Sequence, residues 1–458
     1  MRIFRIPNIS NSSSLKRPFS TSYVSKINDS KSLKIAFFGS DEFSIESLSK
    51  LLEVSQTHKS LISQIDVIAR HPKPVNRGLK ELRDLPIAQF ALENNLNIIR
   101  AETKSEIIDK LTPNQYDLIV AVSYGKLIPS QLLSSVPYSL NVHPSLLPRY
   151  SGASPLQFAL LNHDSITGVT VQTLHPTEFD KGDIVDQIGD IPITRDETLV
   201  SLRDKLGSKG GELLSDVIVN GSFMNPNFQS SFEYSYAKKI PKSMSEVDWD
   251  NETSFGVVRK FNTLGSLFTF KEMKIKKKKK SIIHEYRRVL LSDIREIQLS
   301  EEDQVYASLQ EPGDFTIHKD ESQNLMVIKT KDGFVSVGNL QLEFEPKEDA
   351  NKFWQKLPKR AGDTPVTFST KISKTSSPLP FEDSCNSSAF SAESSTTDCS
   401  NSNLDKAKAI CNSSSSAAPI SPFKLWFKTI ANSNSSVSSA MSWESPLYLL
   451  TNLSFISS

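Results

Sequence analysis

The stretch "KIAFFGSDEFSIESLSKLLE", residues 34–53, determines the expected fold of the first half of the chain. Its apolar start is typical of a buried strand and runs into a turn of small residues. Behind the turn, Phe43, Leu48 and Leu51 recur at the spacing of an amphipathic helix. The stretch therefore predicts a strand, a turn and a helix, which is the repeating unit of an α/β domain.

The same unit recurs further along the chain. Apolar runs predict strands at 63–70, 96–100, 116–125 and 139–144, and helical spacing predicts helices at 85–95, 104–111 and 154–163. This alternation predicts an α/β fold with a Rossmann-like, mostly parallel sheet and helices on both faces. Alternating residues at 167–175 and 183–193 predict a hairpin that adds antiparallel strands at one side of the sheet, and a helix at 196–219 closes the domain.

The rest of the chain differs from the first domain in composition and in its pattern of expected strands and helices. We expect a linker at 221–235, followed at 236–360 by short strands and basic loops that indicate a small OB-like β-barrel domain. Residues 361–458 are rich in Ser and Asn and cannot bury enough apolar area to offset their chain entropy, so we expect a disordered tail. The first domain accordingly spans 34–220, after an N-terminal segment at 1–33.

Composition narrows the classes of function. The chain has 53 Lys and Arg against 52 Asp and Glu, so any contact with nucleic acid must come from local basic clusters. Its 3 cysteines all lie beyond residue 384, which predicts no disulfide framework and no cysteine-based metal site. We expect no metal. No apolar run reaches the roughly 18 residues of a membrane span, so we expect no membrane contact.

The N-terminus has the composition of a targeting segment. Its first 28 residues include Arg2, Arg5, Lys16, Arg17 and Lys26 and no acidic residue. Such a basic, Ser-rich stretch is typical of a mitochondrial transit peptide, and the alternative is an ordinary disordered terminus. We therefore expect the mature protein in the mitochondrial matrix.

Two polar side chains end the strand at 139–144. Asn141 and His143 are two residues apart, so both lie on one face of the strand at its carboxyl end, where α/β sheets bind ligands. An amide and an imidazole that converge there suit a developing oxyanion. The later loop "PTEFDKGD" offers Asp180 and Asp183 to orient the imidazole. The residues alone leave open a structural pair without catalysis.

Longer motifs carry a resemblance to a known family. "NVHPSLLPRYSGASPLQ" (141–157) and "TGVTVQTLHPTEFDKGDIV" (167–185) resemble the signature of folate-dependent formyltransferases. "SYAKKI" (235–240), "VDWD" (247–250) and "VRKFN" (258–262) follow in the order found in methionyl-tRNA formyltransferases of the fungal mitochondrial type. The resemblance covers roughly residues 34–360 and implies that 34–220 is the catalytic domain.

The resemblance implies a reaction and a set of residues. A formyl group would pass from 10-formyltetrahydrofolate to the α-amino group of methionyl-initiator tRNA, for the initiation of mitochondrial translation. Asn141, His143 and Asp180 would be catalytic. The folate donor would bind beside Ser145, Leu146, Leu147 and Pro148.

The resemblance also implies where tRNA binds. A basic loop in the first domain and a basic run in the second would contact the acceptor: Arg70, Lys73, Arg77, Lys80, Lys276, Lys277, Lys278, Lys279, Lys280 and Arg287. Without the resemblance, such basic clusters indicate only a solvent-exposed surface. We expect a monomer.

Two other functions remain open from the sequence. One is another 10-formyltetrahydrofolate-dependent formyltransferase, with a nucleotide precursor or a sugar amine as acceptor. The other is a tRNA-binding module without activity. A basic second domain and a transit peptide favour the tRNA enzyme over the first, and the presence of all three candidate catalytic residues disfavours the second.

Overall fold

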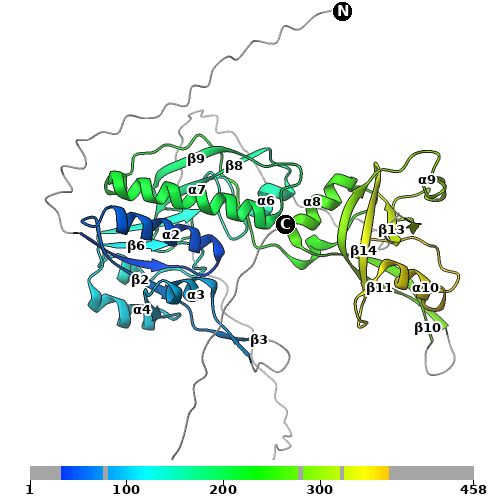
Figure 1. The fold of residues 1–458 in the computed structure, drawn as a ribbon, viewed down its shortest axis with the longest axis horizontal. Helices are drawn as coiled ribbons and strands as arrows, with labels where there is room; N and C mark the ends of the chain where they lie inside the picture. Colours follow the sequence, from blue (N-terminus) through cyan, green and yellow to red (C-terminus); the bar gives the residue numbers. More distant parts are fainter. Residues whose placement is uncertain (1–31, 76–80, 277–281, 320–323, 371–458) are drawn as a thin grey trace, which may run out of the picture. The chain divides into compact units, whose positions relative to one another are not determined.

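The structure is a computed structural model that describes residues 32–75, 81–276, 282–319 and 324–370 (Figure 1). Residues 1–31 of the expected transit peptide, the expected tail beyond residue 370, Arg77, Lys80 and the lysines 277–280 lie outside these residues. Among the described helices, none combines the length and the apolar character that a membrane span requires.

The first domain is built on one twisted sheet. Its strand order is β5-β2-β1-β6-β7-β8-β9, and neighbours are parallel from β5 to β7. Strands β8 and β9 pair antiparallel, so the expected hairpin at one side of the sheet is confirmed. The strands are β1 (Leu33–Phe38), β2 (Ile62–Ala69), β5 (Asn97–Arg100), β6 (Leu118–Ala121), β7 (Tyr138–His143), β8 (Ile166–Thr173) and β9 (Ile184–Pro192).

Helices cover both faces of this sheet (Figure 1). Successive side chains of a strand point to opposite faces, and Phe37 and Phe38 of β1 accordingly lie in two different apolar cores. The core of Phe37 includes α2 (Glu42–Thr57), α3 (Pro86–Glu93), α6 (Pro155–Leu161) and α7 (Leu199–Asn220). The core of Phe38 includes α4 (Lys104–Leu111) and α5 (Ser130–Leu133).

Capping residues set the starts of two helices of the first domain, α2 and α7. Asp41 caps α2, where its carboxylate accepts a hydrogen bond from the Ser44 N–H at 3.2 Å. Thr198 and Ser201 form reciprocal caps, so α7 begins at Leu199 and not at the expected residue 196.

The segment expected as a basic loop after β2 contains a small hairpin, β3 (Lys73–Val75) and β4 (Glu81–Arg83).

The second domain is an antiparallel sheet of order β10-β11-β14-β13-β12, with β15 paired to β14. Its strands are β10 (Leu267–Lys276), β11 (Ile282–Ile297), β12 (Phe315–Lys319), β13 (Asn324–Lys329), β14 (Phe334–Leu342) and β15 (Glu348–Asp349). Three helices that the sequence reading did not anticipate accompany them: α8 (Ser254–Leu264), α9 (Gln304–Ser308) and α10 (Ala350–Ala361). Short 3-10 turns occur at Thr112–Asn114, Ser222–Met224 and Lys242–Ser245.

The end of the described chain completes the second domain. Thr367 bridges to Asp314, next to β12, and Ser369 bridges to Phe270 in β10, so one segment contacts both edges of the sheet. Phe368 is buried and stacks on Phe315, with ring centroids 4.1 Å apart. Phe368 lies beyond the boundary expected at residue 360, and its large apolar surface belongs to this core.

Candidate active site

A cavity of about 710 Å³ opens at the carboxyl end of the parallel sheet. Its lining combines Asp41, which follows β1, with Ser123, which follows β6, and with Asn141 and His143 of β7. Asp180 joins them from the loop between β8 and β9. The cavity lies where the strand order reverses around β1, which is the usual ligand site of an open α/β sheet.

His143 is held on both sides of its ring. Its Nε2 lies 3.0 Å from the carbonyl oxygen of Tyr150, which can only accept, so Nε2 carries a hydrogen. Its Nδ1 lies 3.5 Å from Oδ1 of Asp180. The two side chains are only 7% and 9% exposed. When His143 is protonated, Nδ1–H points at a carboxylate in a largely dry environment, where the attraction between the two charges is strong.

Asp180 is fixed in its own right. Its Oδ2 accepts a hydrogen bond from the Gly152 N–H at 2.7 Å, and its Oδ1 lies 3.4 Å from Nε2 of Gln172. Its backbone has a left-handed φ of 54°, which Asp tolerates better than most residues. Two residues on, a Cβ on Gly182 would lie 1.7 Å from the Thr173 carbonyl oxygen, so only glycine fits there.

Asn141 supplies a free polar group to the site. Its carboxamide lines the cavity, and it makes no hydrogen bond to any residue that the structure describes. The sequence reading expected both Asn141 and His143 to point free donors at one place. In the structure both ring nitrogens of His143 face protein groups, because the loop after β7 turns the Tyr150 carbonyl toward the ring.

The structure separates the two acids of the "FDKGD" loop. Asp180 reaches His143, whereas Asp183 is exposed, does not line the cavity and donates its backbone N–H to Oγ1 of Thr173. The geometry thus brings together Asn141, His143 and Asp180.

The expected donor-binding residues lie behind the cavity wall. Ser145, Leu146 and Leu147 are buried, and the cavity lining includes Pro144 but none of the four residues from Ser145 to Pro148. Ser145 donates its hydroxyl to the Arg149 carbonyl at 2.6 Å, and the Leu147 N–H donates to Thr170. The segment therefore anchors the loop that carries Tyr150, and its contact with the donor stays a prediction.

Sequence reasoning missed several residues of the cavity wall. Asp41 lies beside the cavity, and burial raises the pKa of its carboxyl, although bonds from the Ser44 N–H and Ser123 partly offset that rise. Arg203 of α7 and Tyr236 also line the cavity. The position of Asp41 directly after the first strand was a usable signal, since side chains at that place border the ligand crevice.

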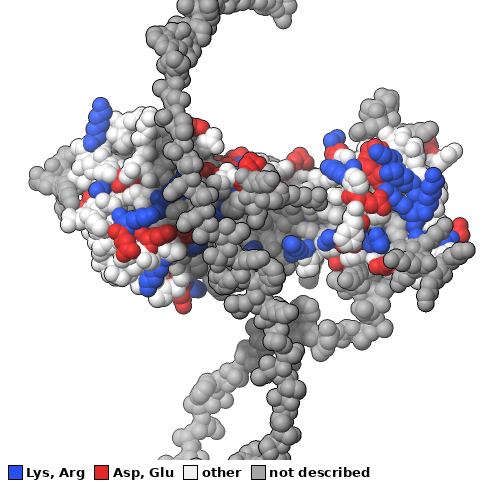
Figure 2. All heavy atoms as spheres, turned by 90° about the horizontal axis from the view of Figure 1, so that it is seen from below, with Lys and Arg blue, Asp and Glu red and all other residues white. Residues whose placement is uncertain are grey.

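The expected tRNA-binding residues are only partly described. Arg70 follows β2, and its Nη2 lies 3.4 Å from Ser40 Oγ. Lys73 of β3 pairs with Glu102 at 3.5 Å. Lys276 ends β10, and Arg287 lies on β11 opposite Lys271. Figure 2 shows basic side chains gathered over the second domain, on the right, with acidic side chains beside them.

The part of the chain that the structure describes contains no group of three or more His, Cys, Asp or Glu residues that could hold a metal ion.

Comparison with known proteins first defines the class. Residues 33–218 match the family model described as "Formyl transferase", which covers the sheet and the whole cavity wall except Tyr236. The protein is thus a one-carbon transferase.

Full-length relatives narrow the class further. The mitochondrial methionyl-tRNA formyltransferase of Saccharomyces cerevisiae is 33% identical over 371 residues, which cover 72% of this chain and 90% of the relative. The methionyl-tRNA formyltransferase of Caldicellulosiruptor saccharolyticus is 30% identical, over 70% of this chain and 96% of the relative. The chain belongs to the methionyl-tRNA formyltransferase family.

A weaker likeness exists among solved structures. HypX from Aquifex aeolicus in complex with tetrahydrofolic acid has a TM-score of 0.44 and 17% identity, over 74% of this chain and 50% of that one. This likeness is too low to support a conclusion about ligand or function.

Proposed function

We propose that the protein transfers the formyl group of 10-formyltetrahydrofolate to the α-amino group of methionyl-initiator tRNA, in the mitochondrial matrix. The observation that carries this proposal is the meeting of the His143–Asp180 pair with the unpartnered carboxamide of Asn141 in one cavity. Membership of the methionyl-tRNA formyltransferase family, with a mitochondrial yeast relative, supports the choice of substrates and of compartment.

The reaction is a direct acyl transfer. The neutral α-amino nitrogen attacks the formyl carbon, the carbonyl oxygen becomes an oxyanion, and the amine loses a proton. The bond from the formyl carbon to N10 then breaks, N10 takes up a proton, and tetrahydrofolate leaves. An α-amino group with a pKa of roughly 8 supplies enough free amine near neutral pH.

Each of the three residues has a distinct role in this proposal. Asn141 donates its amide N–H to the oxyanion, since that group has no partner among the described residues. His143 is held between Tyr150 and Asp180, and it places a positive charge beside the developing negative one when its ring carries both protons. Asp180 orients the ring and, through water, takes part in moving the proton from the amine.

The second domain and the basic segments serve the tRNA. We infer an OB-like barrel, because the segment 366–369 bridges both edges of the five strands β10 to β14. Arg70, Lys73 and Arg287, with the basic residues outside the described part, would contact phosphates and give affinity that falls with salt. The donor would bind near the loop from Ser145 to Pro148, and the enzyme would act as a monomer without a metal.

The first test concerns the residues that stabilise the oxyanion. Asn141→Ala removes the amide donor and His143→Ala removes the charge beside the oxyanion, so each should lower kcat roughly a hundredfold. The measurement is formylation of charged initiator tRNA, with the melting temperature of each variant as control. Near-normal turnover by a folded variant would remove that residue from the mechanism.

A further inference from the structure

The exposed ring of Tyr236 lies at the cavity and has no role so far. Tyr236 lines the cavity, yet 61% of the residue is exposed. Its ring has no aromatic or cationic partner among the described residues. A large aromatic surface that is both exposed and next to the reaction site has room for a flat group of a substrate.

The backbone around Tyr236 is fixed by hydrogen bonds to the loop after β7. Tyr236 bridges to Ser151, and the flanking residues complete the pairing: Ser151 N–H donates to Ser235 O at 2.9 Å, and Ala237 N–H donates to Ser151 O at 2.7 Å. The Ser154 N–H adds a bond to Ala237 O at 3.2 Å. The backbone that carries the ring is therefore ordered before any substrate binds, which lowers the entropy cost of stacking on it.

The ring also contacts the loop that positions the catalytic acid. A Cβ on Gly152 would lie 2.8 Å from Cε2 of Tyr236 and 2.6 Å from Ala237 O, and Gly152 has a φ of 122°. The same glycine donates its N–H to Asp180. Because Gly152 has no side chain, the ring can approach it this closely. Gly152 therefore lies next to both Tyr236 and Asp180.

The surroundings favour a nucleotide as the occupant. The Formyl transferase family model ends at residue 218, before Tyr236, whereas the segment of Tyr236 leads into the second domain. Lys238 and Lys239 follow directly and are exposed. An aromatic ring followed by exposed cations is the arrangement on which proteins stack single-stranded bases and hold their phosphates.

We propose that Tyr236 stacks on the 3′-terminal base of the acceptor tRNA and so positions the esterified amino acid at His143 and Asp180. This inference rests on the proposed function. When the α-amino group enters the cavity, the ribose and base to which the amino acid is attached must lie close by, and Tyr236 is an exposed residue of the cavity lining.

The kinetic test uses three variants. Tyr236→Ala should raise KM for charged initiator tRNA about tenfold, within the range measured for loss of one base–aromatic stack. KM for 10-formyltetrahydrofolate should not change, and Tyr236→Phe, which keeps the ring, should recover the wild-type KM for tRNA. Tyr234→Ala is the matched control, because Tyr234 is 55% exposed on the same segment but covers Lys181 at 4.2 Å and does not line the cavity.

A binding measurement without turnover completes the test. Uncharged tRNA with 2-aminopurine as its 3′-terminal base should lose fluorescence on binding to the wild type and to Tyr236→Phe, but not to Tyr236→Ala. A rise in the donor KM instead of the tRNA KM would assign the ring to the folate and overturn the proposal. Equal quenching by all variants would overturn it too, while a wild type that formylates no methionyl-tRNA would overturn the proposed function itself.

Discussion

Asp180 and Asp183 lie three residues apart in one loop, but only Asp180 pairs with His143. The sequence pattern placed Asn141 and His143 on one face of a strand, and the structure agrees. Spacing alone could not show which of the two acids reaches His143. That depends on the left-handed backbone conformation of Asp180 and on the close approach of Gly182 to Thr173. The bond from His143 to the Tyr150 carbonyl was likewise invisible in the sequence.

The two acids make a matched pair for mutation. Asp180→Asn should lower kcat roughly a hundredfold, since the amide cannot stabilise a charged imidazole, whereas Asp183→Asn should leave kcat within about twofold. Formylation rates at saturating substrates measure both. Equal effects of the two substitutions would contradict the assignment of Asp180.

Elements with strong periodicity were predicted well from the sequence. The helix expected at 104–111 is α4 itself, and β8 and β9 form the expected hairpin. The helices α8 and α10 were missed because their short, basic segments were read together with the strands around them. The closure of the second domain by residues 366–369 depends on contacts far apart in sequence, so no local pattern announces it.

One strand of the second domain carries a buried lysine that should respond to pH. Lys271 of β10 is 1% exposed, and its Nζ donates to Oγ1 of Thr364 at 2.9 Å and to the Glu272 carbonyl at 3.0 Å. Burial lowers the pKa of Lys271 from 10.5 to about 8. Between these values the unfolded chain binds a proton that the native chain has lost, so the free energy of unfolding rises with pH.

Replacing Lys271 should remove this pH dependence. Lys271→Met should be more stable than the wild type below pH 8, and its advantage should shrink as the pH rises toward 10.5. Denaturant unfolding at several pH values measures the difference, and Lys352→Met, at an exposed position on α10, is the control. A difference that stays constant across this range would refute the account of Lys271.

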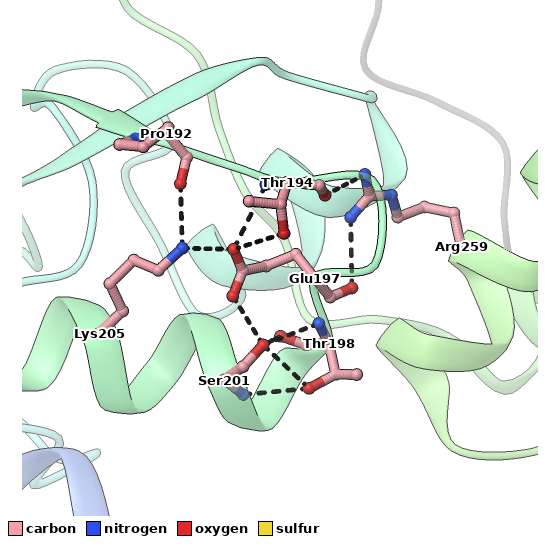
Figure 3. A network of polar contacts seen from close by, with 7 residues as sticks. All are labelled: Pro192, Thr194, Glu197, Thr198, Ser201, Lys205 and Arg259. Atoms are coloured by element: carbon pink, nitrogen blue, oxygen red, sulfur yellow. Dashed lines mark hydrogen bonds and ion pairs between the residues drawn. The ribbon is translucent and has the colours of Figure 1, made fainter.

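Helix α8 of the second domain contacts the loop that precedes α7 of the first domain (Figure 3). Arg259 of α8 donates from Nη2 to the Thr194 carbonyl at 2.8 Å and from Nη1 to the Glu197 carbonyl at 3.2 Å. The Glu197 carboxylate in turn pairs with Lys205 of α7. Since Leu199 and Val200 of α7 line the cavity, a residue of the second domain supports one wall of the site.

We expect this cavity to formylate an amino acid that is attached to tRNA. The most direct measurement is transfer of labelled formyl from 10-formyltetrahydrofolate by the purified wild-type protein to methionyl-initiator tRNA, with uncharged tRNA, charged elongator tRNA and a sugar amine in parallel. We expect label in the charged initiator tRNA, less in the charged elongator and none in the uncharged tRNA or the sugar. Label in the small amine alone would contradict the account and favour a different acceptor, and no transfer to any acceptor would indicate an inactive site.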